Sequence, residues 1–197
     1  MVERIRILKK RQIDRDLEKL IGGLVFLVGR EMGIIFLQRA SVQPGPGVMV
    51  HLWQEHQAKQ PVELRLIEDS QMPAQIISVN APSLAQVQVA LEIMSHVLKF
   101  ESKITLKQQA RKPNKDPGAL MRLALTIKDE PDAEAREILI QSLGSRTANA
   151  RIAAASAMGV LRSKDYSQAL TKALQTEKDS TVLKVITAAL ENCSIAS

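Results

Sequence analysis

The hydrophobic pattern of the chain changes near residue 112. Between Val48 and Asn80, apolar residues tend to recur at every second position, in runs separated by proline-containing segments. From Asp116 onward they recur at every third or fourth position, in segments separated by polar or helix-capping residues. A period of two is typical of strands, and three-to-four spacing is typical of helices. The change predicts two structurally different parts within one chain.

The N-terminal part is expected to be a small antiparallel sheet covered by two helices. Alternation with one apolar face suits a sheet that packs on one side and meets water on the other. Helices are expected at residues 13–29 and, after the capping residue Ser83, at residues 84–107. The expected strands are residues 48–53, 62–67 and 75–79, with a fourth edge strand at residues 34–38. The sequence thus predicts a two-layer α+β module of residues 1–110.

Residues 111–118, with the sequence RKPNKDPG, mark the end of this module. They hold two prolines and a glycine, which interrupt regular structure. Asp116 is a suitable capping residue, and Pro117 suits the first position of a helix. We therefore expect a short basic linker at residues 111–118, followed by a helical part of residues 119–197.

The C-terminal part contains an internal repeat. The expected helices are residues 117–128, 133–144, 148–161, 166–175 and 181–192. Within them, residues 150–158 and residues 182–190 superimpose with an offset of 32. A period of 20–50 residues in paired helices indicates a helical solenoid, in which each pair buries its apolar face against its neighbours.

Two segments of this part resemble a known repeat family. Residues 132–144 and 147–159 are similar to the D-x-x-[VA]-R-x-x-A-x-x-A-L-G pattern of HEAT repeats, in the short form of phycobilisome-lyase-like proteins. The resemblance implies an α-solenoid of HEAT-like helix pairs that acts as a scaffold and grips a protein on the second helix of each pair. It implies a protein-binding surface made by Arg151, Ser156 and Arg162 on one helix and by Lys184 and Glu191 on the next. Some relatives of such repeats attach bilin chromophores, so a bilin lyase-like enzyme is one alternative.

The distribution of charge suggests a second alternative. The net charge of +6 is concentrated at residues 4–19 and 103–115, and such basic patches attract nucleic acid. The candidate nucleic-acid contacts are Lys9, Lys10, Arg11, Lys107, Arg111 and Lys112. Aromatic residues make up only 3% of the chain, however, which leaves few platforms on which bases could stack.

Catalytic and metal-binding patterns are scarce in the sequence. The chain has no nucleophile-elbow, phosphate-loop or dinucleotide-binding motif. Its one cysteine, Cys193, is expected to be a small apolar side chain at a helix end. His51, Glu55 and His56 form the only cluster with ligand-like spacing, and we interpret it as a polar strand end. We therefore expect no enzyme activity, no cofactor and no metal.

The most apolar stretch, Leu20–Val28, is nine residues long, and a charged pair follows it at Arg30-Glu31. A membrane-spanning helix needs about 20 apolar residues, so we expect a cytoplasmic chain without stable membrane insertion; shallow membrane contact by residues 20–37 stays open. The preferred function is a non-catalytic adaptor, assembly or regulatory factor that binds another protein. The N-terminal module would either form a homodimer, through a strand edge or an apolar helix face, or bind a further partner.

Overall fold

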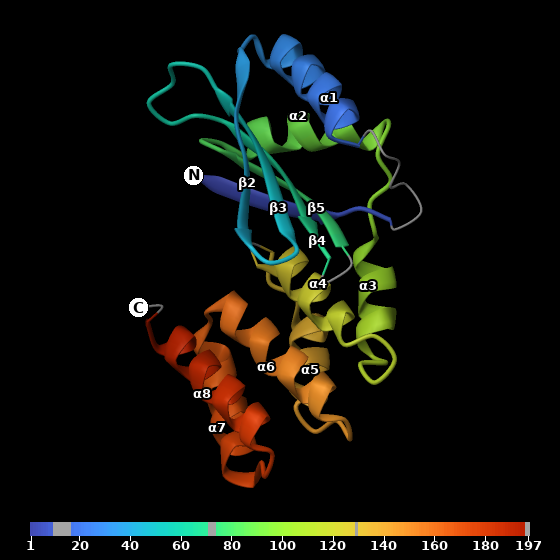
Figure 1. Ribbon diagram of the computed structural model, residues 1–197, viewed down its shortest axis with the longest axis vertical. Coiled ribbons are helices and arrows are strands. Elements are labelled where there is room, and N and C mark those ends of the chain that lie inside the picture. The colour runs from blue at the N-terminus through green and yellow to red at the C-terminus, as the bar shows by residue number, and fades with distance from the viewer. Residues whose placement is uncertain (10–16, 71–73, 129, 196–197) are drawn as a thin grey trace. The chain divides into compact units, whose positions relative to one another are not determined.

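The computed structural model (Figure 1) describes residues 1–9, 17–70, 74–128 and 130–195. The chain divides into two compact units, Met1–Glu101 and Ser102–Ser197, which we call unit 1 and unit 2. Residues 111–118, expected as a linker, lie within unit 2. Unit 1 is mixed α+β and unit 2 is helical in its described part.

Unit 1 contains one antiparallel sheet with the strand order β1-β5-β4-β3-β2. Its strands are β1 (Val2–Ile7), β2 (Phe36–Gly45), β3 (Val48–Glu55), β4 (Glu63–Asp69) and β5 (Ala74–Ala81). The four expected strands are confirmed. Strand β2 is longer than expected, because it continues through Pro44 into the proline-containing segment that precedes β3. Strand β1 was not expected from the sequence. It pairs with β5 from the other end of the unit, with Ile5 opposite Ser78 and Ile7 opposite Ile76.

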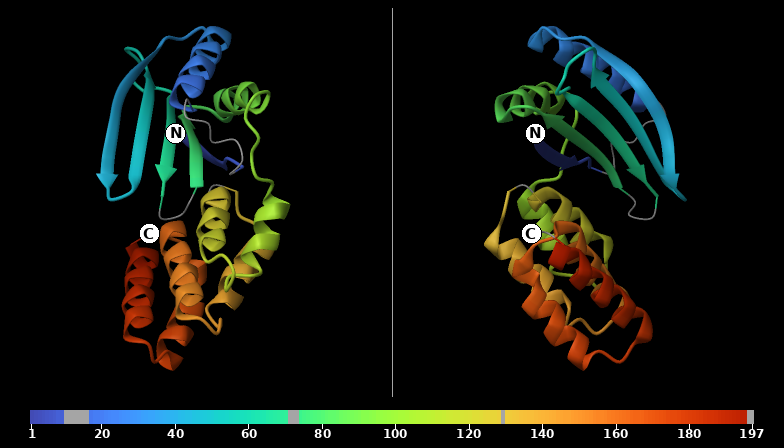
Figure 2. Two further views of the ribbon diagram at one scale, coloured as in Figure 1. Left: turned by 45° about the vertical axis from the view of Figure 1, so that its right-hand side comes forward. Right: turned by 90° about the vertical axis from the view of Figure 1, so that its left-hand side faces the viewer.

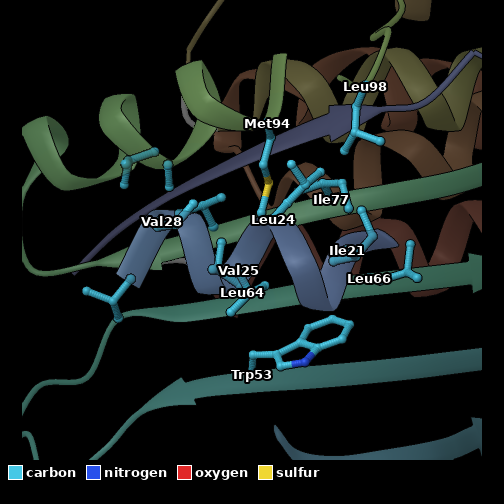
Figure 3. Packing of buried hydrophobic residues seen from close by; sticks show 14 of the residues in the cluster. Ile21, Leu24, Val25, Val28, Trp53, Leu64, Leu66, Ile77, Met94 and Leu98 are labelled. Carbon is cyan, nitrogen blue, oxygen red and sulfur yellow. The ribbon is translucent and has the colours of Figure 1, made fainter. Parts of the chain in front are cut away.

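Helices α1 (Leu17–Met32) and α2 (Leu84–Ser95) cover one face of this sheet (Figure 2). Helix α2 begins at the expected cap, where the Ser83 hydroxyl accepts a hydrogen bond from the Gln86 amide at 3.3 Å. Figure 3 shows the buried side chains that fill the space between helices and sheet. They are Ile21, Leu24 and Val28 from α1, Met94 from α2, and Trp53, Leu64, Leu66 and Ile77 from the strands. Burying each such side chain contributes about 1.5–3 kcal/mol to folding.

The prediction of one long helix over residues 84–107 is wrong. Helix α2 ends at Ser95, and a separate helix, α3 (Lys103–Ala110), begins after Ser102. Between them the chain turns at residues 96–97 and then pairs with the end of β1 and the residue that follows it: Phe100 bridges to Leu8, and the Glu101 amide donates to Ile7 O at 2.8 Å. The periodic apolar residues continue through Leu98, but that side chain fills the sheet–helix core.

Unit 2 contains helices at all five positions expected in the C-terminal part. After α3 come α4 (Gly118–Ile127), α5 (Ala133–Ser142), α6 (Ala148–Leu161), the short 3₁₀ helix η2 (Lys164–Tyr166), α7 (Ser167–Thr176) and α8 (Ser180–Ile195). Helix α6 packs between α4 and α8. Its approach to α8 is close, since a Cβ atom at Gly159 would lie 3.2 Å from the Cα atom of Ala189.

Candidate protein-binding surface

Arg151, expected on a binding surface of α6, forms an ion pair within unit 2. Its Nε lies 2.6 Å from Glu177 Oε2 and its Nη2 lies 3.0 Å from Glu177 Oε1, while Nη1 donates to Ser145 O at 3.0 Å. The Arg151 side chain is 19% exposed and that of Glu177 only 8%. The bond to Arg151, with help from the Asp179 amide, lowers the pKa of Glu177 from 4.5 to about 2. Arg151 therefore ties α6 to the end of α7.

The other four residues of that expected surface lie on two helices. Ser156 is half-buried on α6, and Arg162 ends α6 as an exposed residue with a φ of +50°. Lys184 and Glu191 are exposed on α8. Among the described residues, no hydrogen bond or ion pair joins any two of these five side chains. The structure leaves Arg162, Lys184 and Glu191 exposed.

The basic segment at residues 103–115 is largely neutralised by carboxylates. Lys107 Nζ lies 2.6 Å from Asp132 Oδ2 and 2.8 Å from Glu134 Oε2, and Arg111 also pairs with Glu134. The bond to Asp132, followed by that to Glu134, raises the pKa of Lys107. Lys103 adds a pair with Glu130. These contacts join α3 to the start of α5, so the charges that suggested nucleic-acid binding connect two helices.

The remaining candidate contacts for nucleic acid are Lys9, Lys10, Arg11 and Lys112. Lys9 and Lys112 are exposed. Lys10 and Arg11 lie outside the described residues.

His51 is buried in a polar network at the edge of the core in unit 1. Its Nδ1 lies 2.9 Å from Ser41 Oγ and 3.3 Å from Glu18 Oε1, and its Nε2 lies 3.5 Å from Glu68 Oε2. Glu55 instead accepts a hydrogen bond from the Val62 amide. Within the described part of the chain, no three His, Cys, Asp or Glu residues are placed to hold a metal ion. The network connects α1, β2 and β4 through one imidazole.

Cys193 is fully buried in unit 2, and its Sγ lies 3.7 Å from Met158 O. Burial raises the pKa of its thiol. Because the thiolate is the reactive form, this environment disfavours nucleophilic chemistry.

A cavity of about 360 Å³ lies among α4, α5 and η2 of unit 2. Tyr166 lines it, and burial raises the pKa of this tyrosine to about 12. Arg136 also lines it and donates to Asp165 O at 3.0 Å, with the Asp165 carboxylate 3.6 Å from the guanidinium. Arginine and aspartate thus offset each other's charge within this lining.

Exposed apolar side chains gather on α1 and on the turn that follows it. Phe26 is 70% exposed and Ile35 is 68% exposed, and Leu20 and Leu27 are exposed on the same helix. Most of a protein's large apolar side chains are removed from water, and a contiguous exposed group usually marks an interaction site. This group is therefore a candidate interaction site.

Phe26 and Ile35 border an apolar cavity of about 290 Å³ between α1 and β2. It is lined by the buried residues Val25, Gly29 and Trp53 and by the exposed residue Arg30. We call this cavity, together with Phe26 and Ile35, the α1–β2 surface. An apolar cavity with few polar groups is the usual form of a binding site.

Two glycines of α1, Gly22 and Gly29, line the cavity, and they differ in how much space surrounds them. A Cβ atom at Gly29 would lie 2.7 Å from Ile34 O and 3.2 Å from Phe36 Cδ2, so only glycine allows this approach of α1 to the following chain. A Cβ atom at Gly22 would have no heavy atom within 4 Å, so the space beside Gly22 is open.

The sequence left open membrane contact by residues 20–37 and a homodimer through an apolar helix face, but it did not single out Phe26, Ile35 or the cavity beside them. The signal was present in the stretch Leu20–Val28, which is apolar around the whole helix and not on one side only. Such a pattern shows that the helix has apolar residues on the side away from the core as well as on the side that faces it. The sequence alone does not show which side the sheet covers.

Comparisons with known protein families, with curated proteins and with solved structures gave no match for this chain. None of the helices among the described residues is long and apolar enough to span a membrane.

Proposed function

We propose that this protein is a non-catalytic adaptor, assembly or regulatory factor that binds another protein through the α1–β2 surface. The observation that carries the proposal is the exposure of Phe26 and Ile35 beside an apolar cavity. Keeping apolar area in water costs about 25 cal/mol per Å², a cost that is recovered when a partner covers it. A surface of this kind suits a protein partner because protein interfaces have apolar, aromatic-rich centres.

Unit 2 would act as the second binding element, as a short array of HEAT-like helix pairs. The packing of α6 between α4 and α8 supports this, because every second helix of a solenoid lies in one layer. Arg136 and Arg151, which occupy the arginine position of the two repeat-like segments, each donate to a backbone carbonyl of a neighbouring loop. Arg162, Lys184 and Glu191 are the exposed residues that could contact a partner here.

The nucleic-acid alternative has weaker support, since Lys107 and Arg111 are bonded to carboxylates. A nucleic acid would have to compete with Asp132 and Glu134 for these cations. No contact or cavity described above favours the bilin lyase alternative.

Affinity capture from nuclease-treated native lysate tests the proposal. The bait is the full chain, either unchanged or with both Phe26→Ser and Ile35→Ser. Because both side chains are mostly exposed, the double variant should keep its fold. The matched control is Ile104→Ser, which alters an apolar residue of α3 that is also 70% exposed. We expect stoichiometric protein partners with the unchanged and control baits and their loss with the double variant. Equal recovery by all three baits, or recovery that nuclease abolishes, would refute the proposal.

A further inference from the structure

The α1–β2 surface contains a projecting side chain and a cavity side by side. Phe26 projects into solvent and also lines the cavity formed by Gly22, Gly29 and Trp53. We propose that the partner of this surface is a second copy of the chain, with Phe26 of each copy inserted into the cavity of the other. This inference rests on the proposed function, because it names the partner of the same surface.

A two-fold contact requires one patch to be complementary to itself. Because Phe26 borders its own cavity, a two-fold axis that passes beside this residue places each ring over the cavity of the other copy. A contact with a foreign protein can use the cavity alone or the projecting side chain alone, whereas this two-fold contact needs both in one patch. The presence of both within one patch therefore favours a second copy.

The size of the cavity suits a phenyl ring. Its volume is about 290 Å³, and an apolar cavity of about 150 Å³ is enough to hold benzene. The open space beside Gly22 gives the ring a route into the cavity, since no heavy atom lies within 4 Å of the position of a Cβ atom there. Trp53 and Phe36 would supply aromatic contacts to the inserted ring.

The charges on α1 allow two copies to approach each other. The helix carries Glu18, Lys19, Arg30 and Glu31, so its formal charge is zero although the whole chain carries +6. Arg30 lines the cavity and Glu31 follows it in the chain, so the helix as a whole brings no net charge to a contact between identical copies. It also lacks the excess of Lys and Arg that would attract nucleic acid or an anionic lipid surface.

The β2 edge of the sheet is a poorer route to the same dimer. Strand β2 is an edge strand, but its pairing with β3 is irregular between Gln38 and Ala40 and between Val42 and Gly45. It also contains Pro44, which cannot donate a backbone hydrogen bond. Bulges and proline on an edge strand discourage pairing with a further strand. A contact through side chains of α1 avoids this obstacle.

Sedimentation velocity of the purified full chain, at concentrations from about 1 to 100 µM, tests the inference. We expect the sedimenting mass to rise from 21.7 kDa to twice that value. Phe26→Ser and Gly22→Gln should each weaken the dimer by at least about tenfold, a change of about 1.4 kcal/mol. Gly22→Gln leaves Phe26 in place and fills the entrance to the cavity, and the space around Gly22 lets the variant fold. Ile104→Ser should leave the dimer unchanged.

A chain that stays monomeric over this range would overturn the inference, and so would a dimer that Phe26→Ser and Gly22→Gln leave intact. If the monomer still captures a foreign protein through Phe26 and Ile35, self-association is wrong and the proposed function stands. If the monomer instead sediments with vesicles of phosphatidylcholine and phosphatidylglycerol, and Phe26→Ser abolishes this, a lipid surface is the partner and both proposals fail.

Discussion

At the scale of single residues, Arg151 shows that an arginine of a repeat pattern can have structural partners within its own unit. The pattern placed Arg151 on the expected protein-binding surface of α6, yet its guanidinium forms two bonds with Glu177 and one with Ser145 O. Sequence spacing identified the important residue, but only the loop geometry shows which groups it contacts. Glu177 lies 26 positions away and belongs to no motif.

Replacing Arg151 should destabilise unit 2. Arg151→Met keeps the length of the side chain but leaves the Glu177 carboxylate, 8% exposed, without its cation. Removing one partner of a buried ion pair costs about 3–5 kcal/mol, and partial exposure of Arg151 reduces this to about 2–4 kcal/mol. Urea denaturation followed by circular dichroism measures the loss. Lys184→Met, at an exposed position, is the control, and a loss equal to that of the control would contradict the assignment.

The same pair should make stability depend on acid. In the unfolded chain Glu177 has its ordinary pKa of 4.5, whereas in the folded chain the pKa is about 2. The stabilisation is therefore complete above pH 4.5 and is lost as the pH falls through about 2. Urea titrations between pH 6 and about 2 should show that the advantage of the unchanged chain over Glu177→Gln shrinks below pH 4.5. An advantage that is constant with pH would argue against this contribution.

Two glycines of α1 should respond to alanine in opposite ways. Gly29→Ala places a methyl group 2.7 Å from Ile34 O and should destabilise unit 1 by about 1–3 kcal/mol. Gly22→Ala adds a methyl group to open space in a helix and should stabilise it by up to about 1 kcal/mol. Thermal unfolding at a concentration that keeps the chain monomeric measures both changes. Equal effects would mean that Gly29 is not needed for the close approach.

At the scale of elements, the ion pairs between α3 and α5 explain why a basic segment need not bind nucleic acid. Lys103, Lys107 and Arg111 lie on one helix, and Glu130, Asp132 and Glu134 lie at the start of the other. The acidic residues also lie near the positive end of the α5 dipole, where negative charge is favoured.

Neutralising this basic helix should therefore leave nucleic-acid affinity almost unchanged. Lys107→Gln with Arg111→Gln is expected to alter the affinity for single-stranded DNA by less than about threefold, with no change in its salt dependence. Fluorescence anisotropy at several salt concentrations measures both quantities. A fall of tenfold together with a flatter salt dependence would show that these cations contact phosphates.

The sequence predicted elements well where the signal was local. All five helices expected in the C-terminal part are present, with ends within three residues of the expected ones, because caps and breakers separate them. It missed β1, which pairs with a strand far away in the sequence, with Ile7 opposite Ile76, and it missed the break after Ser95. Both errors arise from non-local contacts, the pairing of β1 with β5 and the bridge between Leu8 and Phe100.

At the scale of the whole molecule, the chain is two units with separate cores. The apolar core of unit 1 lies between one sheet and two helices, and unit 2 has its own buried residues, including Leu120, Leu139, Met158 and Leu170. The sequence predicted this division from the change in hydrophobic period. It placed the boundary at the proline-rich segment 111–118, because it assigned α3 to the first part.

Unit 2 should fold without unit 1. Residues 102–197 expressed alone are expected to be helical by circular dichroism and to unfold cooperatively in urea, since their apolar core lies within the unit. A version that begins at residue 119 is the comparison. It lacks α3, and with it the ion pairs to α5, so it should unfold at lower urea concentration. A helical but non-cooperative 102–197 would contradict the division into independent units.

The most direct test of the central claim, that the α1–β2 surface binds protein, is site-specific photo-cross-linking in cells. The photoreactive amino acid p-benzoylphenylalanine replaces Phe26 in one version of the full chain and Ile104 in the other, two positions with equal exposure. We predict a covalent protein adduct, heavier than the 21.7 kDa chain, at position 26 and none at position 104. No adduct at position 26, or the same adducts at both positions, would contradict this account.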